Sequence, residues 1–227
     1  MVQDYSQWGE QAILSDILAR LPNPNHWCVD VGAGDGINGS NTQALVEAGY
    51  NAILIEGDTD RFAQLQANTP QNAVAIGQVV RPTGYTSLEA ILANTNTPRD
   101  FDLLSIDIDG QDYNVWKHLT NYEPKVVVIE FNPTMAVDLF LVQDENDDRM
   151  LGSSLLAITD LAESKGYRLV AATVTNGIFM RKELCLGLKT SDLSLWQDRR
   201  FMTRCIYDYE GNRYLQGCNA SPWRIDG

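Results

Sequence analysis

The chain has 227 residues, with 30 Asp or Glu against 17 Lys or Arg, which gives a formal net charge of −13 at pH 7. This acidity argues against a nucleic-acid partner, because binding to a phosphate backbone requires clustered Lys and Arg. No apolar run approaches the roughly 18 residues that span a bilayer, and the N-terminus lacks a secretory signal, so we expect a cytoplasmic protein that does not enter membranes.

A chain of this length ordinarily forms one α/β domain around a single core. We therefore predict one domain over residues 1–227, with residues 1–25 as an N-terminal cap segment and residues 190–227 as an extension packed on the domain. The predicted partner is a small molecule, and the chain is expected to be a monomer or a homodimer.

Seven apolar runs bounded by turn residues predict strands. They cover residues 27–31, 52–55, 74–80, 101–106, 125–131, 168–173 and 177–180. Segments with helical periodicity lie between most of them, at residues 41–48, 60–68, 87–93, 115–119 and 154–165. This alternation predicts a Rossmann-like α/β fold, in which a doubly wound, mostly parallel sheet has helices on both faces.

Two segments depart from the alternation. The last two predicted strands are joined only through residues 174–176, which favours a hairpin and therefore an antiparallel last strand. Residues 141–150 are polar and acidic without a hydrophobic period. We expect them to form an exposed loop over the carboxyl ends of the strands.

The first strand leads into the turn "DVGAGDG", which begins at Asp30. In a doubly wound sheet this turn cradles a cofactor, and Gly32 and Gly34 let the backbone approach it closely. Glu56 ends the second strand, where its two carboxylate oxygens can accept hydrogen bonds from both ribose hydroxyls. The predicted cofactor-binding residues are Asp30, Gly32, Ala33, Gly34, Glu56, Gly57, Asp107 and, from the N-terminal segment, Gln7.

The turn lacks the dinucleotide fingerprint G-x-G-x-x-G, because Ile37 occupies the position of its third glycine. Asp35 would repel a pyrophosphate, whereas S-adenosylmethionine carries a sulfonium and an ammonium and no phosphate. S-adenosylmethionine is therefore the predicted cofactor. An NAD(P)-dependent oxidoreductase and a non-catalytic protein that binds S-adenosylmethionine stay open as alternatives.

Acidic and amide side chains follow the fourth and fifth predicted strands. Asp107 and Asp109 come after the fourth strand, and Glu130 and Asn132 after the fifth. Because neighbouring parallel strands end at one edge, and because alternation places Asp107 and Asp109 on one face, we expect these side chains to converge. Such oxygen ligands suit Mg²⁺ or Mn²⁺. Turns at Asp109 and Asn132 are the alternative explanation.

The glycine turn followed by Glu56 resembles motifs I and II of class I S-adenosylmethionine-dependent methyltransferases. The stretches "YSQWGEQAIL", "LLSIDIDGQDYNVW", "VVVIEFNPT" and "GSSLLAITDLAESKGYRLVAATVTNGIFMRKEL" resemble the FkbM-type branch, over roughly residues 5–184. The resemblance implies O-methylation of a sugar or another hydroxylated metabolite. By analogy with metal-assisted methyltransferases of this fold, it also implies a cation held after strands four and five. The segment of residues 176–179 is shorter than the corresponding segment usual in this branch. If it lines the acceptor pocket, the resemblance does not carry over the identity of the acceptor.

Three further residues are weaker candidates. His118 lies in the helical segment after the fourth strand and is a candidate general base together with Asp107 and Asp109. Gln7 and Glu10 belong to "SQWGEQ" near the N-terminus, and we expect this segment to fold over the cofactor.

Overall fold

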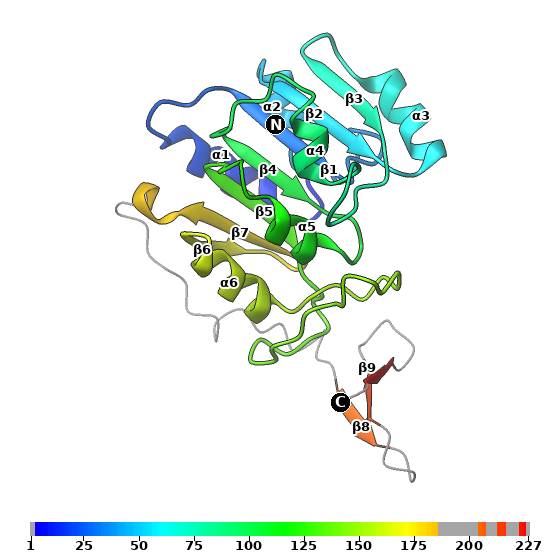
Figure 1. Ribbon diagram of the computed structural model, residues 1–227. Helices are drawn as coiled ribbons and strands as arrows, with labels where there is room; N and C mark the ends of the chain where they lie inside the picture. The colour runs from blue at the N-terminus through cyan, green and yellow to red at the C-terminus, as the bar shows by residue number, and fades with distance from the viewer. Residues whose placement is uncertain (1–2, 186–203, 208–212, 217–222, 226–227) are drawn as a thin grey trace.

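The computed structural model describes residues 3–185 and the strand segments 204–207, 213–216 and 223–225 (Figure 1). The helices are α1 (Glu10–Ala19), α2 (Gln43–Glu47), α3 (Thr59–Asn68), α4 (Leu88–Leu92), α5 (Asp112–His118), α6 (Leu155–Ser164) and the 3-10 turn η1 (Lys182–Leu184). The main strands are β1 (Trp27–Val31), β2 (Asn51–Glu56), β3 (Ala73–Gly77), β4 (Leu103–Ile106), β5 (Val126–Glu130), β6 (Tyr167–Ala172) and β7 (Asn176–Arg181). None of the described helices is long and apolar enough to cross a membrane.

The seven strands form one sheet in the order β3-β2-β1-β4-β5-β7-β6. β1 to β5 pair in parallel, while β7 runs antiparallel to both β5 and β6. The predicted seven-stranded, doubly wound fold with an antiparallel last strand is therefore confirmed. The physical reason is the short β6–β7 connection, since a parallel return would need a crossover of a dozen or more residues.

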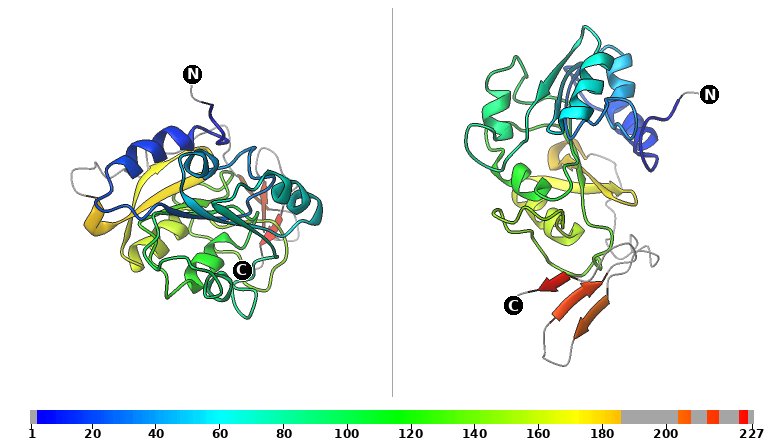
Figure 2. Two further views of the ribbon diagram at one scale, coloured as in Figure 1. Left: turned by 90° about the horizontal axis from the view of Figure 1, so that it is seen from above. Right: turned by 90° about the vertical axis from the view of Figure 1, so that its right-hand side faces the viewer.

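Helices cover both faces of the sheet, as the two views of Figure 2 show. On one face, Leu14 and Leu18 of α1 pack with Leu54 and Val128 from the strands. On the other face, α4, α5 and α6 bury a cluster around Trp116, which is 0% exposed. Alternating side chains of each buried strand thus enter two separate apolar layers.

Two predicted strands are shorter than expected at one end. The third ends at Gly77, after which the Gln78 N–H donates to the Glu56 carbonyl and the chain turns toward α4. The fourth begins at Leu103 rather than at Phe101. Both strands keep their predicted place in the sheet.

Near the C-terminus, β8 (Arg204–Tyr207), β9 (Arg213–Gln216) and β10 (Trp223–Ile225) form an antiparallel sheet of their own, in the order β10-β9-β8. The sequence pattern had indicated no regular element there. Residues 190–203 of the predicted extension lie outside the described residues. Packing of the extension on the domain, and a single domain over residues 1–227, stay predictions.

Candidate functional site

A row of buried polar side chains crosses the carboxyl edge of the sheet on the α1 face. Asp30 of β1 lies beside Ser105 of β4 in the strand register, and Glu130 of β5 lies opposite Asn176 of β7. Each lies two residues from a residue that packs against α1, after it in the parallel strands and before it in antiparallel β7, because alternate residues of a strand share a face. The strand order therefore brings acidic groups from distant parts of the sequence to one edge.

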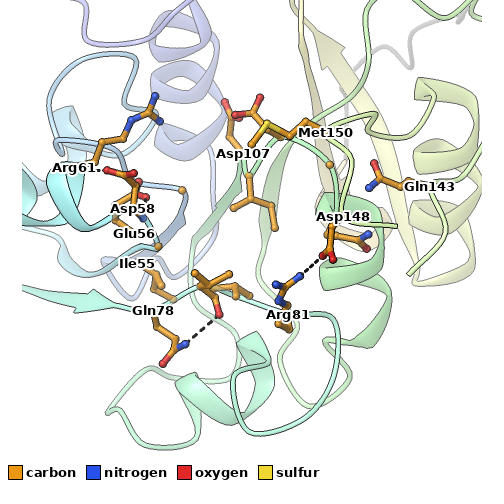
Figure 3. A pocket seen from close by; sticks show the side chains of 18 of the residues that line it. Ile55, Glu56, Asp58, Arg61, Gln78, Arg81, Asp107, Gln143, Asp148 and Met150 are labelled. Atoms are coloured by element: carbon orange, nitrogen blue, oxygen red, sulfur yellow. Dashed lines mark hydrogen bonds and ion pairs between the residues drawn. The ribbon is translucent and has the colours of Figure 1, made fainter. Parts of the chain in front are cut away.

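Two cavities open along this edge. The larger has a volume of about 600 Å³ and is lined by the ends of β2 and β3, the turn after β4, and the loop that follows β5. Figure 3 shows Glu56, Asp58 and Arg61 on one side of it and Arg81, Gln143 and Asp148 on the other. The smaller cavity has a volume of about 200 Å³. The two are contiguous, since both are lined by Gly32, Arg61, Asp107 and Asp109.

Glu56 links the glycine turn to the start of α3. One carboxylate oxygen accepts from the Gly34 N–H at 2.8 Å, and the other accepts from the Asp58 N–H at 2.7 Å. The side chain is 7% exposed and lines the larger cavity. Each oxygen retains a further lone pair, so Glu56 can still accept from a ligand in that cavity.

Asp30 and Asn41 form the floor of the smaller cavity. The Asp30 carboxylate accepts from the Thr42 hydroxyl at 2.6 Å, and burial raises its pKa to about 6 although that hydrogen bond opposes the shift. The Asn41 amide donates to Ser105 at 3.2 Å, while its buried Oδ1 has no partner among the described residues. A ligand with N–H donors would satisfy that oxygen.

The predicted carboxylate cluster comes together beside the junction of the two cavities, where Asp107 and Asp109 line both cavities and Glu130 lines neither. One oxygen each of Asp107, Asp109 and Glu130 lies within 4.8 Å of the other two. Burial, reinforced by the neighbouring carboxylates, raises the pKa of Asp107 to about 7 and that of Glu130 to about 10. Carboxylates this close must share protons or hold a cation.

The reason given above for the closeness of Asp107 and Asp109 is corrected by the structure. β4 ends at Ile106, and Asp109 has a φ of 55°, so the two residues are not part of one extended segment. The buried Asp112 carboxylate shapes the turn instead, because it accepts from the Ile108 N–H and the Gly110 N–H, both at 2.9 Å. Sequence reasoning missed Asp112, whose signal was an acidic residue at the start of a helix after a D-G turn.

Asn132 makes a turn rather than joining the cluster as a free ligand. Its Oδ1 accepts from the Thr134 N–H at 2.9 Å and from the Thr134 hydroxyl at 2.6 Å. Its amide donates to the Leu151 carbonyl at 2.6 Å. The turn that Asn132 and Pro133 also suggested accounts for these contacts, so the predicted metal-ligand role of Asn132 is not supported.

His118 lies away from the cluster. It occupies the last turn of α5, and its Nε2 is 3.0 Å from a carboxylate oxygen of Glu145. It lines neither cavity. The cause is the helix itself, since α5 begins at the site and rises about 1.5 Å per residue away from it. The geometry does not support His118 as a general base.

The acidic loop after β5 has a buried centre and is only partly exposed. Gln143 is 3% exposed, and its amide nitrogen donates to the carbonyls of Asp147 at 2.7 Å and Arg149 at 2.6 Å. Its Oε1 accepts from the Gly152 N–H at 2.7 Å. One side chain therefore gives the loop a fixed shape at the rim of the larger cavity, where it was predicted to lie.

An ion pair joins this loop to the segment after β3. Arg81 lies 2.7 Å from Asp148 across the cavity mouth (Figure 3), with exposed fractions of 54% and 81%. Because an exposed pair is screened by water, we expect Arg81→Ala to lower the free energy of unfolding by less than about 1 kcal/mol. Urea denaturation measures this, with Arg20→Ala at the exposed Arg20–Asp16 pair as the control. A loss above about 2 kcal/mol for Arg81→Ala alone would contradict the expectation.

No protein-family model matches the sequence, and no curated protein is significantly similar to it. Among solved structures, the chain is similar to precorrin-6y C5,15-methyltransferase from Geobacter metallireducens (15% identity, TM-score 0.46, 74% of this chain and 86% of that one). It is also similar to the N-terminal domain of EvdMO1 with SAH bound (10% identity, TM-score 0.48, 76% of this chain and 80% of that one). A third similar structure is a SAM-dependent methyltransferase from Aquifex aeolicus (10% identity, TM-score 0.45, 76% of this chain and 89% of that one).

Two of these neighbours are named as methyltransferases, and the EvdMO1 domain has SAH bound. At identities of 10% to 15% and TM-scores of 0.45 to 0.48, the similarities carry no conclusion about the activity of this chain. The fold is established by the strand order and by the reversed β7. Membership of the FkbM-type branch stays a prediction.

Proposed function

We propose that this protein is an S-adenosylmethionine-dependent methyltransferase that acts on the oxygen of a small hydroxylated acceptor, such as a sugar. The observation that carries the proposal is the position of Glu56. It bonds to the glycine turn and lines the larger of two contiguous cavities, and Asp107 and Asp109 of the carboxylate cluster line both. A nucleoside in the larger cavity would lie next to the smaller cavity, which has a volume of about 200 Å³ and is lined mainly by polar residues.

The residues present fit the chemical groups of this cofactor. Glu56 would accept hydrogen bonds from the ribose hydroxyls. Asp30 and the unpartnered Asn41 Oδ1 would accept from the ammonium group in the smaller cavity. Arg61 is the one cationic side chain that lines the smaller cavity among the described residues, so it would bind the carboxylate.

The same charges count against the alternative of a dinucleotide. Asp30, Asp107 and Asp109 all line the smaller cavity, which lies against the glycine turn where a pyrophosphate would sit. Their charge would repel two phosphates and attract a sulfonium and an ammonium. A protein that binds S-adenosylmethionine without turnover remains the second candidate, and methyl transfer to an acceptor distinguishes the two.

The cluster would assist the acceptor. Asp107, Asp109 and Glu130 fit a divalent cation such as Mg²⁺ or Mn²⁺, because three carboxylate oxygens converge there. Bound S-adenosylmethionine supplies an electrophilic methyl group, and a bound cation lowers the pKa of a hydroxyl. The contribution of this chain is to orient both partners at the junction and to keep the acceptor oxygen beside the cluster.

Glu56→Ala tests the cofactor assignment. Loss of two charge-assisted hydrogen bonds to the ribose should weaken the binding of S-adenosylhomocysteine by about 2–4 kcal/mol. Calorimetry measures this with the wild type and the variant, and NAD serves as a second ligand for which we expect no binding. Ser87→Ala is the control, since it removes the cap of α4 at a residue that lines neither cavity, and keeps Glu56. Tight binding of NAD with none of S-adenosylhomocysteine would overturn the proposed function.

A further inference from the structure

Glu10 is a fully buried carboxylate at the start of α1, with an exposed fraction of 0%. It was expected to fold over the cofactor, but it lines neither cavity and bonds within the protein instead. One oxygen accepts from the Trp8 N–H at 2.8 Å. The other accepts from the Thr173 hydroxyl and from the Asn176 amide, the latter at 3.2 Å.

These contacts anchor one end of the short segment that precedes α1. The other end is anchored after the glycine turn, where Ser6 forms a β-bridge with Gly39, and at the end of α2, where the Tyr5 hydroxyl donates to Glu47 at 2.6 Å. Residues 5–9 therefore pass along the carboxyl edge of the sheet from this region to the β6–β7 turn.

Gln7 lies between the two anchors and lines the smaller cavity together with Asp107 and Asp109. Gly9 separates it from α1 with a φ of 88°, so the helix alone does not fix where Gln7 points. The hydrogen bond from the Trp8 N–H to Glu10 acts on the residue directly after Gln7. Glu10 thus holds the residue that follows Gln7, while Gln11 of α1 holds the residues before it, since its Oε1 accepts from the Tyr5 N–H and its N–H donates to Ser6 Oγ.

The same carboxylate also reaches the other side of the site. Asn176 lies directly opposite Glu130 in the antiparallel β5–β7 pairing, and such opposite side chains are about 5 Å apart. Glu10 therefore ties the N-terminal segment to the strand end beside the carboxylate cluster. Burial of a charge needs such partners, and here they come from two segments, the N-terminal segment and the β6–β7 turn.

We propose that Glu10 is a positioning residue, which holds Gln7 in the wall of the smaller cavity so that the N-terminal segment completes the compartment for the amino-acid part of the cofactor. The inference rests on the proposed function, since it assigns the smaller cavity to that part of S-adenosylmethionine. It adds a role for a residue that touches neither cavity.

Glu10→Gln tests this role, because it keeps the size of the side chain and removes one acceptor oxygen and the charge. We expect the variant to bind S-adenosylhomocysteine about tenfold more weakly by calorimetry. The matched control is Asp102→Asn. Asp102 is also 0% exposed, but it lies at the opposite edge of the sheet, where it pairs with Lys125 at 2.6 Å. Both variants should melt at lower temperature, and only Glu10→Gln should lose affinity.

A double-mutant cycle with Gln7→Ala distinguishes positioning of Gln7 by Glu10 from a general loss of stability in the protein. If Glu10 acts through Gln7, the effect of Glu10→Gln on affinity disappears in the Gln7→Ala background, whereas independent effects add. Should Glu10→Gln not fold, Thr173→Val takes its place in the same cycle, since it removes one donor to the carboxylate.

Unchanged affinity in folded Glu10→Gln, or full additivity with Gln7→Ala, would overturn the inference and leave the proposed function intact. Wild-type protein that does not bind S-adenosylhomocysteine would contradict the proposed function, and the inference would fall with it.

Discussion

Removal of divalent cations with EDTA is expected to abolish methyl transfer, and added Mg²⁺ or Mn²⁺ is expected to restore it. The expectation rests on Asp107, Asp109 and Glu130, which have oxygens within 4.8 Å of one another. A cation there would relieve their mutual repulsion and lower the pKa of an acceptor hydroxyl. Release of S-adenosylhomocysteine over a panel of hydroxylated acceptors measures the activity.

Two measurements without an acceptor test the same site. Mn²⁺ binding by calorimetry should be lost in Asp109→Asn, and Mg²⁺ should raise the melting temperature of the wild type by mass action. Asp109→Asn should slow turnover by roughly 100-fold and should impair turnover more than cofactor binding, because Glu56 and the glycine turn chiefly hold the cofactor. Asp148→Asn is the matched control, since it removes one charge from the rim of the larger cavity and leaves the cluster intact.

Full activity in EDTA, together with no Mn²⁺ binding, would reject the metal hypothesis. One carboxylate of the cluster would then act directly as the general base. Asp107 would be the first candidate, because burial and its acidic neighbours raise its pKa to about 7, which suits proton transfer near neutral pH.

The second large effect is expected from Gly32→Ala in the glycine turn. A Cβ on Gly32 would lie 1.8 Å from the backbone carbonyl oxygen of Asp107, and Gly32 has a φ of 87°. The clash involves two backbone segments, so no side chain can rotate away from it. Left-handed strain and overpacking together should lower the free energy of unfolding by about 2–5 kcal/mol. Urea denaturation measures the loss.

Gly34→Ala is the control in the same turn. Gly34 also has a positive φ, of 59°, but an added Cβ would meet no atom within 4 Å. Only the backbone strain remains, so we expect a loss of about 1–2 kcal/mol. Equal losses for the two variants would show that the close approach of Gly32 to Asp107 does not constrain this part of the fold.

Local pattern was enough to predict the fold and the closeness of three carboxylates, while the cofactor-binding roles stay predictions. The periods of apolar residues placed all seven strands of the main sheet, and the three-residue connection over residues 174–176 predicted the reversed strand. The glycine turn, Glu56 and the convergence of Asp107, Asp109 and Glu130 were also predicted. Each of these follows from residues close in sequence, together with the rule that parallel strands end at one edge of a sheet.

Local pattern did not decide between a turn and a metal ligand at Asn132, and it did not predict partners distant in sequence. The Asn132 side chain accepts from Thr134 within a turn, and its amide donates to the Leu151 carbonyl, 19 residues away. His118 is close to the cluster in sequence, but the direction of α5 carries it toward Glu145.

The sequence by itself determined which side chains end the strands, because alternation and turn residues act over a few positions. Only the tertiary structure decided which of them meet a cavity and which are held by other groups. The Glu10 carboxylate makes this plain, since its partners Thr173 and Asn176 lie more than 160 residues away. The strand order places β7 beside β5, and α1 packs on one face of the sheet next to these strands. This arrangement brings Glu10 to Thr173 and Asn176. A buried charge is stable only where folding supplies its hydrogen-bond donors.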